Sequence, residues 1–132
     1  GMVASMLGAH VTMTDYMDDP LEFSRMNSAL NQINNIRFKK MDWRKPDGSL
    51  VSDVLLASDV AYEKRSFKYL VVAFEKLVKP GGTILLSEPN RKFTARFFEM
   101  LKSNNFSCQG FDFTINQNNF PKQVKVYRII RQ

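Results

Sequence analysis

The sequence has little cysteine and histidine and no long hydrophobic segment. Its 132 residues include 1 Cys, Cys108, and 1 His, His10. A single cysteine excludes an internal disulfide, and one histidine leaves no ligand cluster for structural zinc. No apolar run approaches the roughly 20 residues of a membrane-spanning helix, and the first residues lack the basic region of a signal peptide. We therefore expect no metal site, no membrane segment and a cytoplasmic location.

The composition favours one folded domain over residues 1–132. The chain is 44% hydrophobic and has 11 Phe, which is enough for a core without a disulfide or metal. The net charge is +6. The basic residues are dispersed, so the charge indicates nonspecific attraction to anions rather than a dedicated nucleic-acid surface.

Strand-like and helix-like periodicities alternate along the chain. The predicted helices cover 2–7, 20–33, 63–79 and 92–103, and the predicted strands cover 9–14, 36–40, 53–58, 83–87, 106–115 and 124–130. Gly8 suits a left-handed helix cap, and Pro80-Gly81-Gly82 is expected to end a helix. Alternation of this kind predicts an α/β fold: a mostly parallel, Rossmann-like sheet covered by helices on both faces. The last two strands predict an antiparallel hairpin.

Acidic residues follow four of the predicted strands. They are Asp15, Asp42, Asp59 and Glu88, and Trp43 stands beside the second. In open α/β sheets ligands bind beyond the carboxyl ends of the strands. A carboxylate there can accept hydrogen bonds from ribose hydroxyls, and an acid beside an indole can hold an adenine amine and cover the ring. The pattern predicts an adenosine-binding rim.

Two other interpretations fit some of these acids. Acidic residues after strands also serve as turn formers and helix caps. An acid after the second strand also marks nicotinamide-dinucleotide enzymes, but their Gly-x-Gly-x-x-Gly fingerprint is absent. With a single histidine, His10, neither a Ser-His-Asp nor a Cys-His catalytic system is expected.

Several motifs together resemble class I S-adenosylmethionine-dependent methyltransferases. They are Gly8-Ala9-His10-Val11-Thr12-Met13-Thr14-Asp15, Asp42-Trp43, Leu56-Ala57-Ser58-Asp59-Val60-Ala61-Tyr62 and Lys79-Pro80-Gly81-Gly82-Thr83. More narrowly, Asp59-Val60-Ala61-Tyr62 is similar to the Asp-x-x-Tyr motif of the lysine-methyltransferase-like group, methyltransferase family 16. The resemblance extends over nearly the whole chain.

The resemblance implies S-adenosylmethionine as cofactor and assigns roles by position. Asp15 matches the acid that binds the cofactor ribose, and Asp42 and Trp43 match the pair around the adenine. Ser58 would lie beside the cofactor at a strand end.

Asp59 and Tyr62 are the implied catalytic residues. Asp59 matches the residue near the methionine part of the cofactor and the substrate nitrogen, and Tyr62 would shape that pocket. Glu88-Pro89-Asn90-Arg91 resembles an acid-Pro-x-Arg segment of small bacterial relatives.

One part of the family pattern is missing from this sequence. The family begins with a central strand that ends in a Gly-rich loop, and no such strand or loop precedes Met2 here. The resemblance therefore implies an N-terminally truncated domain whose first strand is absent. Without that strand, the strands that end at Asp15 and Asp59 would have unpaired backbone groups, and three arrangements would give these groups hydrogen-bond partners. The two strands pair directly, which we favour; a second molecule supplies a strand and makes a homo-oligomer; or the missing segment lies elsewhere.

The resemblance implies N-methylation of a protein lysine or of a small amine. The alternative is a non-catalytic interaction module that keeps the methyltransferase fold. Methyl transfer from an activated sulfonium depends mainly on positioning, so neither hypothesis needs a further catalytic cluster.

Overall fold

The structure is a computed structural model that describes residues 1–89, 94–117 and 120–132. The chain forms two compact units, Gly1–Leu50 and Val51–Gln132. Residues 1–50 carry as many acidic as basic side chains, so the net charge of +6 belongs to the second unit. Each unit is described by itself below, and the single domain over 1–132 stays a prediction.

The first unit contains a parallel two-stranded sheet. Its elements are α1 (Met2–Met6), β1 (Val11–Asp15), α2 (Asp18–Leu30), β2 (Ile36–Lys40) and the 3-10 turn η1 (Gly48–Leu50). The two strands pair in register from Val11 opposite Ile36 to Asp15 opposite Lys40. Gly8 has a φ of 91° after α1, so the predicted left-handed position is confirmed.

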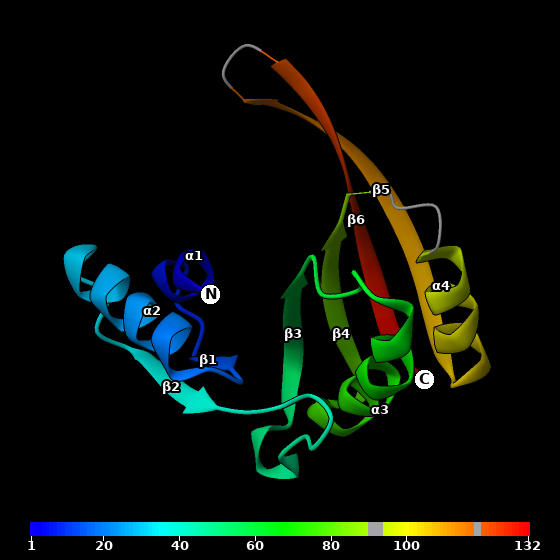
Figure 1. The fold of residues 1–132 in the computed structure, drawn as a ribbon, viewed down its shortest axis with the longest axis horizontal. Coiled ribbons are helices and arrows are strands. Elements are labelled where there is room, and N and C mark those ends of the chain that lie inside the picture. Colours follow the sequence, from blue (N-terminus) through cyan, green and yellow to red (C-terminus); the bar gives the residue numbers. More distant parts are fainter. Residues whose placement is uncertain (90–93, 118–119) are drawn as a thin grey trace. The chain divides into compact units, whose positions relative to one another are not determined.

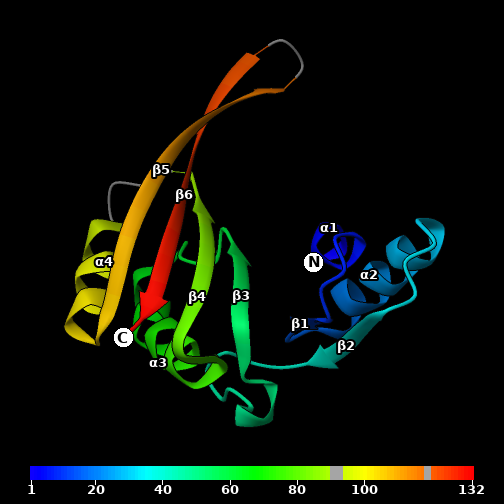
Figure 2. The same cartoon turned by 180° about the vertical axis from the view of Figure 1, so that it is seen from behind.

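The second unit contains a four-stranded mixed sheet in the order β3-β4-β6-β5. Its elements are β3 (Ser52–Ser58), η2 (Lys64–Ser66), α3 (Phe67–Leu77), β4 (Val78–Glu88), α4 (Thr94–Ser103), β5 (Phe106–Gln117) and β6 (Phe120–Arg131). β3 and β4 are parallel, and β6 is antiparallel to both β4 and β5 (Figures 1 and 2). The α/β class and the antiparallel hairpin are confirmed.

The core of the second unit lies between its sheet and the helices α3 and α4. Phe97 is fully buried, with its ring centroid 5.1 Å from that of Phe67, 6.0 Å from Phe74 and 5.7 Å from Phe98. Ile84, Leu86 and Ile129 point from the sheet and are also fully buried. This aromatic cluster packs α3 and α4 against one face of the sheet and so holds the strands in place.

Within the second unit, α3 and α4 pack on one face of this sheet, and the element that covers the opposite face stays a prediction. In β3 the alternate residues Val54 and Leu56 are 53% and 50% exposed, and Leu85 of β4 is 39% exposed. Leu56 pairs with Leu85, so these side chains share one face. An apolar strand indicates that burial is favourable but not which element covers it.

Two predicted boundaries differ from the structure. α2 begins at Asp18 rather than Pro20 and ends at Leu30, and its Met26 and Leu30 are exposed rather than part of an apolar stripe. Pro80-Gly81-Gly82 does not separate a helix from a strand: β4 begins at Val78, and its pairing with β3 shifts between Ser52 and Val54. A Cβ at Gly82 would lie 2.6 Å from Val78 Cγ1 and 2.9 Å from the Asp53 carbonyl oxygen. Glycine is therefore required in this irregular segment.

The direct pairing of the strands that end at Asp15 and Asp59 stays a prediction, because the two strands belong to different units. Among the described residues, β1 pairs with β2 and β3 pairs with β4, and each ladder stays within its own unit. Within its own unit, each of β1 and β3 is paired along one edge among the described residues.

Replacing Phe97 by alanine is expected to destabilise the second unit by about 3–5 kcal/mol, because it removes the ring at the centre of the aromatic cluster. Phe23→Ala is the control, since Phe23 is 65% exposed, and it should cost less than about 0.5 kcal/mol. Urea unfolding followed by circular dichroism measures both changes. Equal losses for the two variants would contradict this description of the core.

Candidate functional site

The first unit brings Asp15, Asp42 and Trp43 together at one end of its sheet. Asp15 is the last residue of β1, and its carbonyl oxygen accepts a hydrogen bond from the Met41 backbone N–H at 2.8 Å. Because β1 and β2 are parallel, Asp42 and Trp43 leave β2 at the same end. All three side chains are partly buried. The sequence therefore predicted correctly that these three residues follow adjacent strand ends.

One oxygen of the Asp15 carboxylate is bound by a neighbouring backbone N–H. Its Oδ1 accepts the Met17 N–H at 2.9 Å, which holds the turn after β1. Within the described residues, Oδ2 makes no hydrogen bond. One oxygen of Asp15 is thus held in place while the other can accept a hydroxyl, as expected of a ribose-binding acid.

Asp42 is held by Arg44, a contact that the sequence analysis missed. Oδ1 accepts the Arg44 backbone N–H at 2.9 Å, and the guanidinium donates to both carboxylate oxygens, with Nη2 2.6 Å from Oδ2. These hydrogen bonds lower the pKa of Asp42 from its ordinary value of 3.8. The sequence does place an arginine two residues after this aspartate, a spacing at which a turn can bring the two side chains together. Asp42 is oriented and fully charged at neutral pH.

The second unit positions Ser58 and Asp59 at the carboxyl end of β3. The Ser58 hydroxyl accepts a hydrogen bond from the Ser87 hydroxyl at 2.8 Å, and the Asp59 N–H donates to the Ser87 carbonyl oxygen at 2.9 Å. Asp59 has a φ of 50°, the left-handed region, which is uncommon for a residue with a side chain. The main chain thus turns sharply where the strand ends, and backbone outliers of this kind concentrate at functional sites.

Tyr62 lies on the surface of the same segment. The segment is anchored by Ala61, which is 1% exposed, whereas the Tyr62 side chain is 52% exposed. A buried alanine between Asp59 and Tyr62 fixes the path of the motif while leaving the tyrosine accessible. The Asp-x-x-Tyr motif therefore has a buried position at Ala61 and exposed positions at Asp59 and Tyr62.

Glu88 ends β4 beside the end of β3, but it is buried rather than open to a ligand. It is 1% exposed and stands opposite Lys125 of β6 in the sheet register. Its place at a strand end agrees with the sequence, and its burial indicates a structural role. Asn90 and Arg91, the rest of the acid-Pro-x-Arg segment, lie outside the described residues.

The predicted site residues thus form two groups, one at the carboxyl end of each parallel ladder. Asp15, Asp42 and Trp43 form the first group, and Ser58, Asp59 and Tyr62 belong to the second. The first group fits an adenosine: two oriented carboxylates and a partly exposed indole match hydroxyls, an amine and an aromatic ring. A single rim that contains both groups stays a prediction.

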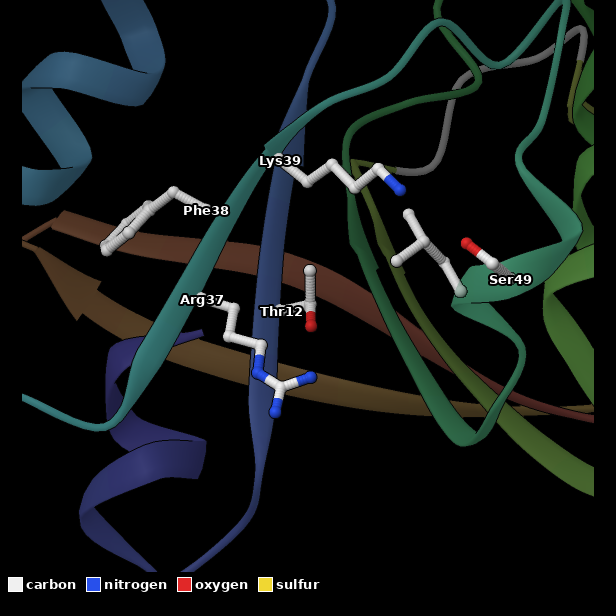
Figure 3. Close-up of a pocket in the computed structure, with 6 residues that line it drawn as sticks. Thr12, Arg37, Phe38, Lys39 and Ser49 are labelled. Atoms are coloured by element: carbon white, nitrogen blue, oxygen red, sulfur yellow. The ribbon is translucent and has the colours of Figure 1, made fainter.

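A pocket of the first unit lies apart from these residues. It has a volume of about 510 Å³ and is lined by Thr12, Arg37, Phe38, Lys39, Ser49 and Leu50. Figure 3 shows Lys39 reaching toward the turn that carries Ser49, while Phe38 points the other way. Lys39 pairs with Asp47 and lowers the pKa of that carboxyl. None of the predicted site residues lines this pocket.

The described residues contain no group of three His, Cys, Asp or Glu side chains that could hold a metal ion. In the same described part of the chain, no helix is both long and apolar enough to span a membrane.

Replacing Arg44 by alanine is expected to raise the pKa of Asp42 toward 3.8, because the guanidinium that favours the charged carboxylate is lost. Since the pKa of Asp42 is lowered in the folded chain, its ion pair stabilises the fold above pH 3.8. That contribution fades as the pH falls below 3.8 through the lowered value. A carboxyl-carbon NMR titration measures the shift.

Arg25→Ala is the matched control for that titration, because Arg25 pairs with Glu22 instead. It should leave the Asp42 midpoint unchanged. A midpoint that is the same in the Arg44 variant and in the unchanged chain would show that Arg44 does not hold the carboxylate.

Comparisons with known proteins identify the family of the chain. The family profile described as "Lysine methyltransferase" matches residues 1–104. The chain is 33% identical over 108 residues to Protein N-lysine methyltransferase METTL21A of Xenopus tropicalis, covering 77% of this chain and 50% of that protein. It is 30% identical over 113 residues to Protein-lysine methyltransferase METTL21E of Bos taurus, covering 75% of this chain and 39% of that protein. The chain thus spans about half or less of the length of these two curated relatives.

Solved structures share the fold. A methyltransferase from Pyrococcus furiosus superposes with a TM-score of 0.76 at 22% identity, covering 98% of this chain and 68% of that one. The N-methyltransferase NodS from Bradyrhizobium japonicum, solved with S-adenosyl-L-homocysteine, superposes with a TM-score of 0.70 at 14% identity, covering 97% of this chain and 71% of that one. These likenesses establish the Rossmann-like methyltransferase fold. Since the family profile covers most of its length, the chain belongs to the lysine methyltransferase family.

Proposed function

We propose that this chain carries cofactor- and substrate-facing residues of an S-adenosylmethionine-dependent enzyme that methylates a protein lysine. The observation that carries the proposal is the grouping of Asp15, Asp42 and Trp43 at one strand end and of Ser58, Asp59 and Tyr62 at another. Family membership and the names of the two relatives support lysine as the acceptor.

The residues of the first unit would hold the adenosine part of the cofactor. Asp15 presents one unengaged oxygen to the ribose hydroxyls, with the other fixed by the Met17 N–H. Asp42 faces the adenine amine while Arg44 keeps its carboxylate charged and oriented. Trp43 contributes an aromatic face for the adenine. Each carboxylate-to-hydroxyl or carboxylate-to-amine bond is charge-assisted and therefore stronger than a neutral one.

The residues of the second unit would position the acceptor. Bound S-adenosylmethionine supplies a methyl group already activated by a sulfonium. The Asp59 carboxylate would attract the cationic lysine side chain and, once the ammonium has released a proton to water, hold the neutral nitrogen in line with the methyl group. The left-handed backbone at Asp59 directs this residue out of the sheet, and Tyr62 would form a wall beside it.

S-adenosylhomocysteine is expected to bind the chain, and Asp15→Asn is expected to weaken that binding by about tenfold or more, since a charge-assisted hydrogen bond is lost. Asp53→Asn is the matched control: Asp53 lies at the amino end of β3, is 81% exposed at its side chain and pairs with Lys79. Isothermal titration calorimetry measures all three affinities. Absence of binding to the unchanged chain at millimolar ligand would refute cofactor binding by this chain.

Asp59→Asn separates binding from catalysis. The variant should keep its affinity for S-adenosylhomocysteine yet transfer about a hundredfold less labelled methyl group from S-adenosylmethionine to lysine residues of lysate proteins. Unchanged transfer would remove Asp59 from the acceptor site. Equal loss of binding and transfer would move Asp59 to a role in holding the cofactor.

A further inference from the structure

The strand β5 forms one edge of the second unit's sheet. Among the described residues it pairs with β6 alone, in register from Phe106 opposite Arg131 to Gln117 opposite Phe120. Its other edge therefore offers backbone N–H and C=O groups along a strand of 12 residues. A long unpaired edge of this kind is a template for another strand.

Among the described residues, the far half of this hairpin has no third strand paired to it. β4 pairs with β6 only as far as Glu88 opposite Lys125, and the hairpin continues beyond that point as two strands (Figure 1). Near the base, Tyr127 packs over Gly110 and stacks on Phe98 with centroids 3.9 Å apart. The hairpin is thus anchored to the core at one end, and its projecting half is a two-stranded ribbon that gains little stability alone.

One face of β5 is apolar and exposed. Phe111, Phe113 and Ile115 alternate along β5 and are 41%, 51% and 50% exposed. The residues opposite Phe111 and Phe113 are Val126 and Val124, so these side chains share a face. Several large apolar side chains on one exposed ribbon face are a feature of interaction surfaces.

The residues that discourage pairing with another strand are distributed unequally between β5 and β6. β5 contains one charged residue, Asp112, and no proline or lysine. The residues that usually protect a sheet edge lie instead on the inner strand β6, as Pro121, Lys122 and Lys125. Asp112 is already paired with Lys125 at 3.3 Å. The edge formed by β5 is therefore nearly neutral and lacks the lysine or proline residues that discourage pairing with another strand.

We propose that β5 pairs antiparallel with β5 of a second copy of this chain, about a twofold axis at Thr114. In this register Phe113 stands opposite Ile115 of the second copy, and the apolar faces of both hairpins join into one surface. The two Asp112 residues are kept four positions apart along the strands. The cationic β6 strands are separated by three strand spacings, roughly 14 Å, beyond the screening length at physiological salt.

This self-complementarity favours a second copy over another partner. A strand that is nearly neutral and apolar on one face matches itself without creating like-charge contacts, whereas the positive charge of the hairpin lies on β6, away from the proposed contact. The pairing also supplies the missing neighbour for the projecting ribbon, which becomes part of a wider sheet.

Disulfide trapping tests the pairing directly. Thr114→Cys in a Cys108→Ser background places two cysteines at the proposed axis, where directly opposite Cβ atoms lie roughly 4.5–5.5 Å apart, close to disulfide geometry. Gln123→Cys in the same background is the matched control. Gln123 stands opposite Thr114 and hydrogen-bonds to it, so both variants lose the same contact, but Gln123 lies on β6.

The purified Thr114 variant is expected to form a covalent dimer about tenfold or more faster than the Gln123 variant, because pairing raises the local cysteine concentration. Adding Phe113→Lys should abolish that difference. Sedimentation of the unchanged chain should show dimer mass that falls on dilution. Equal cross-linking rates, a monomer at all concentrations, or cross-links that form only with lysate proteins would overturn the proposal.

Discussion

Parallel pairing of neighbouring strands is the constraint that positions each of the two groups of candidate site residues. In the first unit it makes Asp15 and Asp42 leave the sheet at the same end, because β1 and β2 run in one direction and in register. In the second unit the pairing of β3 with β4 places Ser58 beside Ser87 and lets the Ser87 carbonyl oxygen hold the Asp59 N–H. Backbone hydrogen bonds between paired strands therefore set where each acid leaves its sheet.

The order of helices and strands could be predicted from periodicity, because alternation of apolar residues reports which residues favour burial. What covers each face could not. Val54, Leu56 and Leu85 lie on the sheet face opposite α3 and α4, and their apolar pattern predicts burial of that face without identifying the element that covers it. The covering element is a tertiary feature, so no pattern within the strand itself encodes it.

The candidate site could be predicted as residue types following strands, and Asp15, Asp42, Trp43, Ser58 and Asp59 all stand where that rule places them. The rule could not separate accessible acids from buried ones. Glu88 follows its strand equally well but is 1% exposed, because its alternation places it on the packed face. It also could not foresee that Arg44 holds Asp42, since turn geometry decides which neighbours reach a carboxylate.

Amide hydrogen exchange at Met41 and Asp59 tests the central claim most directly. The N–H groups of these residues bond to the Asp15 and Ser87 carbonyl oxygens at 2.8 and 2.9 Å, closing each ladder at the end that carries the acids. If the ladders fix the site, both amides exchange as slowly as those within the paired strands. Exchange at the rate of an unstructured chain, with the rest of each ladder protected, would show that the acids are not held by strand pairing.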